Sequence, residues 1–477
     1  MTASSPPAAP TAVGPADASP PGPVFADLAL APHLLQGVDA LGYTAMTPIQ
    51  ARALPEILAG RDVIAQAPTG SGKTAAFGLG VLHRLDPALV ETQALVLCPT
   101  RELADQVGKQ LRRLALGIPN LKISVLCGGI PLGPQLASLA HAPHVVVGTP
   151  GRIQELTKKR ALHLRHVRTL VLDEADRMLD MGFEEAIRDI VKRIPPERQG
   201  LLFSATFPDP IRTLGTAMLR DAVEVRTDDG ETAPAIEQFF VEVEPARRTP
   251  TLAALLLQHR PASTVVFCNT RAEVNEVAAS LVHYGFGALA LHGDMEQRDR
   301  DEVLLRFANR SCNVLVASDV AARGLDVEDL AAVVNLELPH DADTYVHRIG
   351  RTGRAGRSGL ALSLVSPREL PRATGIETHT GTPLRWLRAP AMPARANVPA
   401  APMVTLRIDA GRSDKLRPGD IVGALTGEAG LQKEAIGKID VFATRSYVAV
   451  DRAQAGRTVT RLREGKIKGR RFRVASL

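Results

Sequence analysis

The chain has 477 residues, of which 45% are hydrophobic and 23% charged, and it carries a formal net charge of +6. This length exceeds what one hydrophobic core supports and predicts two or three domains of ordinary globular composition. No apolar run approaches the roughly 18 residues that a membrane-spanning helix needs, so we expect a cytoplasmic protein with no membrane partner.

The N-terminal segment, residues 1–23, is rich in Pro, Ala and Ser. It lacks the basic start and apolar centre of a secretory signal, and we expect a disordered tail. The four cysteines are scattered and none forms a Cys-x-x-Cys pair, which argues against a zinc site or a disulfide framework.

A glycine-rich loop joins a predicted strand, Arg61–Gln66, to a predicted helix, Lys73–His83. Glycines leave backbone N–H groups accessible to phosphates, the following lysine reaches the β- and γ-phosphates, and the adjacent hydroxyl ligates Mg²⁺. The first position of this pattern is usually Gly and is Ala67 here. The loop predicts ATP-binding residues Thr69, Gly70, Ser71, Gly72, Lys73 and Thr74.

Strand-like runs then alternate with helical patterns, which predicts a parallel sheet covered by helices on both faces. One run, Thr169–Leu172, is followed directly by the acids Asp173, Glu174 and Asp176. Asp173 would hold Mg²⁺ through water or directly, and Glu174 would polarise water for in-line attack. Alone, such acids would equally suit a helix start; together with the phosphate loop they indicate an ATPase.

The strand–helix alternation restarts after a polar, turn-rich stretch near residues 226–234. We therefore expect two α/β domains, residues 24–226 and 227–388, the second without a phosphate loop. A Pro/Ala-rich linker, 389–402, precedes a third unit, 403–477, with the element order β-α-β-β-α-β of an RNA-recognition motif. That unit holds 16 Lys and Arg against 8 Asp and Glu, a net charge of +8. This excess favours a nucleic-acid partner, although a solvated basic face remains an alternative.

The first two domains, from about Phe25 to Ala389, resemble DEAD-box RNA helicases. The resemblance rests on Asp173-Glu174-Ala175-Asp176 and on a series of ordered motifs that includes the highly specific segment from Tyr345 to Gly356. It implies two tandem RecA-like parallel-sheet domains followed by a small α+β RRM-like domain. It also implies that Gln50 reads the adenine edge, because a carboxamide offers both a donor and an acceptor. Phe25 and Tyr43 are the expected aromatic neighbours of the adenine, though either could be core.

The resemblance assigns further roles by position. Asp176, Ser204 and Thr206 would couple hydrolysis to strand separation. Asp326 would touch ATP, and His347 would touch both the nucleotide and the first-domain motifs. Arg351 and Arg354 would act as arginine fingers. The implied catalytic residues are Lys73, Asp173, Glu174, His347, Arg351 and Arg354. None of the four arginines Arg348, Arg351, Arg354 and Arg357 is expected in a core. The implied RNA-backbone contacts are Pro99, Thr100, Arg101, Gly129, Thr149, Gly151, Arg152, Asn269, Arg271, Gly293 and Ser318, where Ser318 stands in place of the more usual Thr.

The third unit resembles the DbpA-type RNA-binding domain of bacterial DEAD-box proteins, most clearly in Gly419–Leu431 and Gly465–Val474. This resemblance implies a hairpin of 23S rRNA in the peptidyl-transferase region as target, and large ribosomal subunit precursors as partners. Lys466, Lys468, Arg470 and Arg471 are candidate phosphate ligands, although a solvated strand edge would have the same pattern. Tyr447 is a candidate base-stacking residue.

The leading hypothesis is thus an ATP- and Mg²⁺-dependent RNA helicase that remodels rRNA, acting as a monomer. An alternative is an ATP-gated RNA clamp, for which turnover matters less. It would use the same nucleotide contacts, so the sequence does not exclude this alternative. A DNA helicase is disfavoured by the DEAD sequence, by Gln50 and by the appended RNA-type unit.

Overall fold

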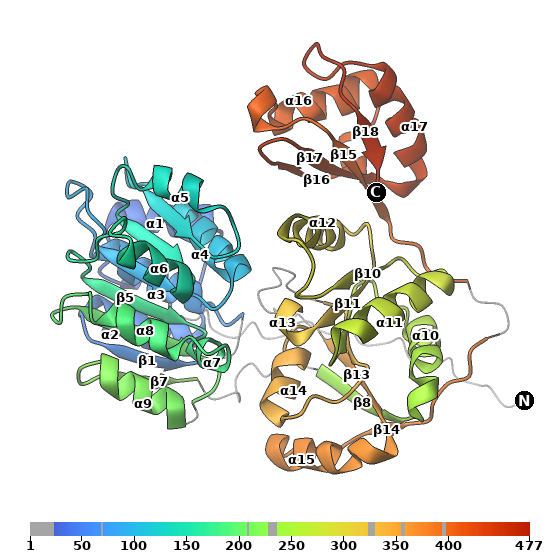
Figure 1. The fold of residues 1–477 in the computed structure, drawn as a ribbon, viewed down its shortest axis with the longest axis horizontal. Helices are drawn as coiled ribbons and strands as arrows, with labels where there is room; N and C mark the ends of the chain where they lie inside the picture. The colour runs from blue at the N-terminus through green and yellow to red at the C-terminus, as the bar shows by residue number, and fades with distance from the viewer. Residues whose placement is uncertain are drawn as a thin grey trace, which may run out of the picture.

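The computed structural model describes residues 23–67, 70–207, 209–227, 236–322, 330–353, 358–393 and 397–477. Three units are visible: two helix-covered sheets and a smaller unit beside the second sheet, which we call the C-terminal module (Figure 1). No described helix is both long enough and apolar enough to span a bilayer.

The first domain is built on seven parallel strands in the order β3-β4-β2-β5-β6-β1-β7. The strands are β1 (Val63–Gln66), β2 (Ala94–Leu97), β3 (Ile123–Leu126), β4 (Val145–Gly148), β5 (Thr169–Asp173), β6 (Gln199–Ser204) and β7 (Val223–Arg226). The helices are α1 (Pro32–Ala40), α2 (Pro48–Leu58), α3 (Lys73–His83), α4 (Arg101–Leu114), α5 (Leu132–Ser138), α6 (Pro150–Lys158), α7 (Ala175–Asp180), α8 (Glu184–Val191) and α9 (Asp209–Met218).

Strands β2, β4, β5 and β6 are buried along their whole length, as expected when helices cover both faces. Helix α3 has the predicted bounds. Strand β7 was not predicted, because it lies at the sheet edge and its alternate residues are exposed. In a parallel sheet all strands end at one edge, so the loops after β1, β2, β4, β5 and β6 gather there.

The second domain repeats this plan, with parallel strands in the order β10-β11-β9-β12-β13-β8-β14. The strands are β8 (Ile236–Glu242), β9 (Thr264–Cys268), β10 (Ala288–Leu291), β11 (Val314–Ser318), β12 (Ala332–Asn335), β13 (Gly359–Val365) and β14 (Trp386–Leu387). The helices are α10 (Arg248–His259), α11 (Arg271–His283), α12 (Gln297–Ala308), α13 (Asp319–Ala322), α14 (Ala342–Ile349) and α15 (Leu370–Thr380). The polar stretch near residues 226–234, expected to separate the two domains, lies mostly outside the described residues.

The C-terminal module has an antiparallel sheet in the order β16-β17-β15-β18. Its elements are β15 (Met403–Ile408), α16 (Pro418–Gly423), β16 (Ile436–Val441), β17 (Ser446–Asp451), α17 (Arg452–Glu464) and β18 (Val474–Ser476). The predicted order is confirmed, and the last strand is short, beginning at Val474. A tight turn with left-handed backbone at Lys468 and Gly469 takes up the preceding residues.

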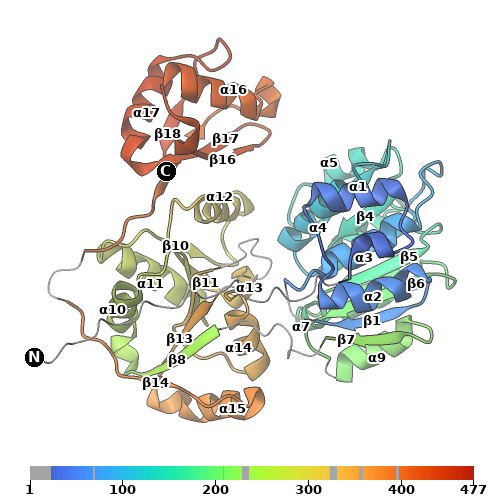
Figure 2. The ribbon, with the colours of Figure 1, turned by 180° about the vertical axis from the view of Figure 1, so that it is seen from behind.

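The module rests on the second domain. Seen from both sides, α12 lies between the module and the rest of that domain (Figures 1 and 2). The linker is in contact as well: Val398 packs on the second domain's core, and Asn313 Nδ2 donates to the Pro399 carbonyl at 3.0 Å. The module is therefore docked against the second domain.

Candidate functional site

The phosphate loop has the shape that the sequence predicts where it is described. Gly70 and Gly72 take φ values of 83° and 93°, which favour glycine, and lead directly into α3. Lys73 is buried, and its Nζ donates to the Ala67 carbonyl at 2.7 Å. The Ser71 hydroxyl is buried without a hydrogen-bond partner in the described part of the chain. This cradle suits a phosphate; Thr69 lies outside the described residues.

Gln50 ties the expected adenine site to this loop. Its Oε1 accepts from the Thr47 backbone N–H at 2.9 Å, and its Nε2 donates to the Gly72 carbonyl at 3.0 Å. A Cβ at Gly72 would lie 2.4 Å from Gln50 Nε2, so the close approach requires glycine. The Gln50 side chain is thus hydrogen-bonded directly to the phosphate loop.

The two aromatic candidates differ in exposure. Phe25 is 3% exposed and belongs to the first domain's core, where its ring stacks on Tyr43 with centroids 6.2 Å apart. Tyr43 is half-buried, and its hydroxyl accepts from Gln110 Nε2 at 3.0 Å. Phe25 has a structural role here, and the adenine contact remains a prediction for both.

The acidic group at the end of β5 is buried beside the phosphate loop. Burial raises the pKa of Asp173 to about 7, although Lys73 opposes the rise. Burial likewise lowers the pKa of Lys73, against the attraction of Asp173 and Glu174. Among described residues no cluster of three or more His, Cys, Asp or Glu could hold a metal alone. A divalent ion here would thus need phosphate oxygens as well as Asp173 and Thr74, which is usual for Mg²⁺.

Asp176 connects the acidic strand end to the loop after β6. Its Oδ2 accepts from the N–H groups of Ala205 and Thr206 at 3.2 and 3.0 Å and from the Thr206 hydroxyl at 3.0 Å, while the Ser204 hydroxyl accepts from the Asp176 N–H at 3.3 Å. Burial opposes ionisation of Asp176, but His347 and these hydrogen bonds outweigh it and lower the pKa. The three predicted coupling residues are thus in direct contact.

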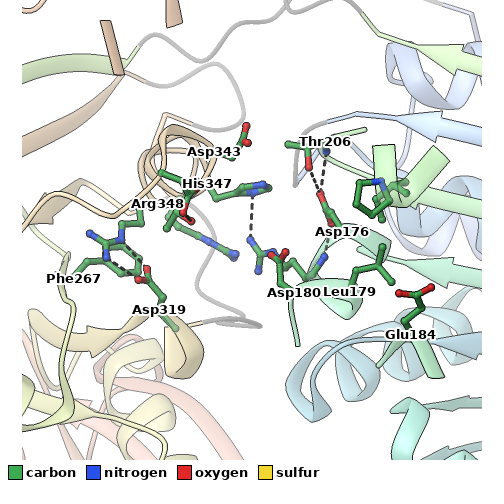
Figure 3. Close-up of a pocket in the computed structure, with 17 residues that line it drawn as sticks. Asp176, Leu179, Asp180, Glu184, Thr206, Phe267, Asp319, Asp343, His347 and Arg348 are labelled. Carbon is green, nitrogen blue, oxygen red and sulfur yellow. Dashed lines mark hydrogen bonds and ion pairs between the residues drawn. The ribbon is translucent and has the colours of Figure 1, made fainter. Parts of the chain in front are cut away.

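A cavity of about 580 Å³ lies between the two domains at this point (Figure 3). Asp176 and Thr206 line it from the first domain, and His347 and Arg351 from the second. Arg177 Nη2 lies 3.4 Å from His347 Nδ1, and since arginine only donates, that nitrogen accepts. Burial, reinforced by Arg177, lowers the pKa of His347 to about 4. The imidazole is therefore neutral at neutral pH, where the hydrogen bonds and the charge of Lys73 still lower the pKa of Asp176.

The arginines after α14 do not share one role. Arg351 is buried and lines the cavity, whereas Arg354, like Asp326, lies outside the described residues. Arg348 is 2% exposed, so the expectation that it lies outside the core is wrong. Its guanidinium pairs bidentately with Asp319 at 2.7 Å on both arms, also donates to Asn335, Glu337 and Asn269, and lies over the Phe267 ring. This full set of acceptors compensates the buried charge.

The first-domain RNA candidates gather on the loops after β2, β3 and β4. Thr100 caps α4, accepting from the Leu103 N–H at 3.3 Å. Thr149 accepts from the Gly128 N–H at 3.1 Å, and Arg152 Nη2 donates to the Ile130 carbonyl at 3.0 Å. A Cβ at Gly129 would meet Arg101 Nη1 at 2.3 Å. These residues gather at the starts of α4 and α6, where Gly129 and Gly151 are exposed, Thr100 and Arg101 are half-buried, and Pro99, Thr149 and Arg152 are buried.

The second-domain candidates are more dispersed. Arg271 is exposed and paired with Asp294, and Gly293 is exposed beside it. Asn269 is occupied by the Arg348 side chain and the Leu338 carbonyl, and Ser318 is buried. The structure thus places Asn269 and Ser318 among supporting residues, while their contact with RNA stays a prediction.

A cross-domain contact that sequence reasoning did not assign joins α4 to α12. Arg101 donates to Gln297, and Arg300 pairs with Glu102 at 3.2 Å while both side chains are nearly buried. These residues are almost 200 positions apart, and nothing in the two sequence segments indicates that they pair. Only the arrangement of the two domains reveals the contact.

The basic candidates of the module lie at its surface. Lys466 and Arg470 are exposed, and Lys468 Nζ donates to the Lys415 carbonyl at 2.6 Å and pairs with Asp420 at 3.3 Å. Tyr447 is only 5% exposed, and its hydroxyl donates to Glu302 Oε2 of α12 at 3.2 Å. Tyr447 is therefore covered in this docked arrangement and is not open to a stacking base.

Three families match successive parts of the chain. They are the DEAD/DEAH box helicase family over residues 47–214, the helicase conserved C-terminal domain over 248–356, and the DbpA RNA binding domain over 405–476.

Known proteins match either most of the chain or about three quarters of it. The ATP-dependent RNA helicase DbpA of Escherichia coli is 53% identical over 94% of this chain and 98% of its own, and CshA of Listeria monocytogenes is 44% identical over 77% and 70%. The structure of S. cerevisiae Dbp5 bound to RNA and ADP BeF3 is 32% identical, with a TM-score of 0.71 over 77% of this chain and 96% of that one. That of Mss116p bound to ssRNA and AMP-PNP is 26% identical, with a TM-score of 0.69 over 75% and 77%.

Proposed function

The chain belongs to the DEAD-box family of ATP-dependent RNA helicases and carries a DbpA-type RNA-binding domain, and on that premise we propose that its substrate is 23S rRNA. The site of action would be the peptidyl-transferase hairpin in precursors of the large ribosomal subunit, in the cytoplasm. The observation that carries this proposal is the basic C-terminal module, with its net charge of +8 and its family match over residues 405–476.

For the ATPase step we propose roles that fit the observed cradle. Lys73 leaves the Ala67 carbonyl to bind the β- and γ-phosphates, and Thr74 with Asp173 holds Mg²⁺, which when bound supplies charge neutralisation at the phosphates. Glu174, buried at the end of β5, orients the attacking water. Gln50 selects the base and transmits its occupancy to Gly72.

RNA dependence follows from the division of the site between domains. The phosphate loop and acidic strand end belong to the first domain, while His347 and Arg351 belong to the second. RNA bridging the surface around Arg101 and the second domain would favour closure, and closure completes the site. Because binding at two domains favours a bent strand, we propose local duplex opening rather than long-range translocation.

Equilibrium binding tests the choice of RNA. A fluorescent 23S fragment containing the peptidyl-transferase hairpin is titrated with the full chain and competed with a fragment whose hairpin sequence is scrambled. The proposal predicts at least tenfold weaker competition by the scrambled fragment at fixed salt, since salt alters all phosphate contacts. Equal competition would refute the rRNA target while leaving the helicase activity untouched.

A further inference from the structure

A second cavity, of about 230 Å³, lies in the seam between α12 and the C-terminal module. It is lined by Arg298, Asp301, Glu302 and Leu305 of α12 and by Phe442, Thr444, Arg445 and Tyr447 of the module. Pockets for drug-sized ligands span about 300–1,000 Å³, so this one suits a single nucleobase.

We propose that this seam binds one nucleotide of single-stranded RNA, with its base against Phe442 and its phosphate toward Arg298 and Arg445. The inference rests on the proposed function in one respect, since it takes single-stranded RNA to be bound by the helicase core. The proposed site is new in that its residues come from both the second domain and the C-terminal module, so the nucleotide would contact both units.

Phe442 has the exposure and the rigidity that a stacking residue needs. Its side chain is 42% exposed, and its ring meets that of Tyr447 edge-on at 5.7 Å. Its backbone is fixed by hydrogen bonds from its N–H to the Arg445 carbonyl and from the Arg412 N–H to its own carbonyl, both 2.8 Å. A ring held in place loses little conformational entropy on binding, and stacking accepts any base.

The charges around the cavity favour one orientation of a nucleotide. Arg298 is exposed at the start of α12, and the Arg445 guanidinium is restrained by Asp409 at 3.8 Å. These two cations suit a phosphate. The carboxylates of Asp301 and Glu302 repel phosphate but accept hydrogen bonds from base N–H groups. The base is therefore expected on the α12 carboxylate side and the phosphate on the arginine side.

The seam also continues the surface expected to bind RNA. Gln297 of α12 contacts Arg101, one of the first-domain RNA candidates. Glu302, which lies five residues farther along the same helix, contacts Tyr447 of the module. The two residues of α12 lie about 7.5 Å apart along the helix axis and about 140° apart around it. A strand leaving Arg101 would therefore pass partly around α12 to reach Phe442.

A single-tryptophan reporter tests the site in the full chain. Phe442→Trp is placed in a Trp386→Phe background, because Trp386 is the only native tryptophan. Addition of a single-stranded RNA oligonucleotide should quench the fluorescence of the introduced indole by at least a third, whereas exposed Trp386 of the wild type should stay unquenched. No quenching, when anisotropy of the same labelled RNA shows binding, would overturn the seam site. Absence of RNA binding by the wild type would instead overturn the proposed function.

Photocrosslinking provides a test without substitution in the seam. RNA containing 5-bromouridine should form adducts on wild-type peptides that include Phe442 or the first turns of α12. Phe442→Leu should abolish the module adduct and raise the dissociation constant about five- to tenfold. The matched control, Trp386→Leu, removes another exposed aromatic and should leave that constant unchanged. Adducts confined to the first domain, or equal constants for Phe442→Leu and wild type, would refute the proposal.

Discussion

Arg177 connects Glu174 of the first domain to His347 of the second. Its Nη1 lies 3.3 Å from Glu174 Oε2, and its Nη2 lies 3.4 Å from His347 Nδ1. The carboxylate proposed to orient the attacking water is therefore linked through one guanidinium to the opposite domain. Separation of the domains would break the contact between Arg177 and His347. The Arg177 guanidinium could then move relative to the Glu174 carboxylate.

Acidification should weaken this domain contact. The pKa of His347 is about 4 in the closed arrangement, below its ordinary value of 6.5, so the contact is fully favourable above pH 6.5 and is lost progressively toward pH 4. By pH 5 the loss reaches up to about 2 kcal/mol. Energy transfer between dyes on the two domains, with RNA and a non-hydrolysable nucleotide, should report opening between pH 7 and 5. His347→Asn should flatten this dependence, and an unchanged pH profile in that variant would contradict the assignment.

Glu174→Gln should separate binding from turnover. The amide keeps the shape and retains a contact to Arg177 but cannot accept a proton, so kcat should fall at least about 100-fold. Nucleotide and RNA affinities should remain within about threefold of wild type. Glu185→Gln on α8 removes an exposed carboxylate and is the matched control. Wild-type turnover in Glu174→Gln would exclude its proposed role.

Thr206→Ala tests the coupling of hydrolysis to strand separation. The substitution removes one of three hydrogen bonds to Asp176 Oδ2 and leaves the two backbone donors. A lost bond of this kind costs about 1 kcal/mol, too little to unfold the loop. RNA-stimulated ATP hydrolysis should stay within about threefold, while duplex unwinding per ATP should fall about tenfold. A parallel loss of both activities would show a general defect of the site.

Sequence alone was enough for the parts of the site that follow strands, because residue type and spacing fix loops at the carboxyl edge of a parallel sheet. It failed for Arg348, since an arginine on a helix normally lies in solvent. The acceptors that bury this arginine, on Asn269, Asp319 and Asn335, follow or end three different strands, and only the strand order brings them together. The covering of Tyr447 by α12 likewise has no local sequence signal.

Arg348→Ala should destabilise the second domain. Removing one partner from a buried ion pair costs about 3–5 kcal/mol, because Asp319 and the amide partners lose their donor. Thermal unfolding should shift down by several degrees, with the ATPase defect secondary to it. Arg372→Ala removes a 40% exposed side chain with only long contacts to Leu338 and Glu369, and should shift unfolding little. An equal effect of the two would argue against the buried network.

The C-terminal module is proposed to direct an RNA-dependent ATPase to 23S rRNA. Steady-state ATP hydrolysis of the full chain and of a chain ending before residue 389 is measured with no RNA, with generic RNA and with the 23S hairpin fragment. We predict low activity without RNA, the strongest stimulation by the hairpin fragment for the full chain, and equal stimulation by both RNAs for the shortened one. A hairpin preference that survives the truncation would contradict the role of the module, and activity unaffected by RNA would contradict the division of the site between two domains.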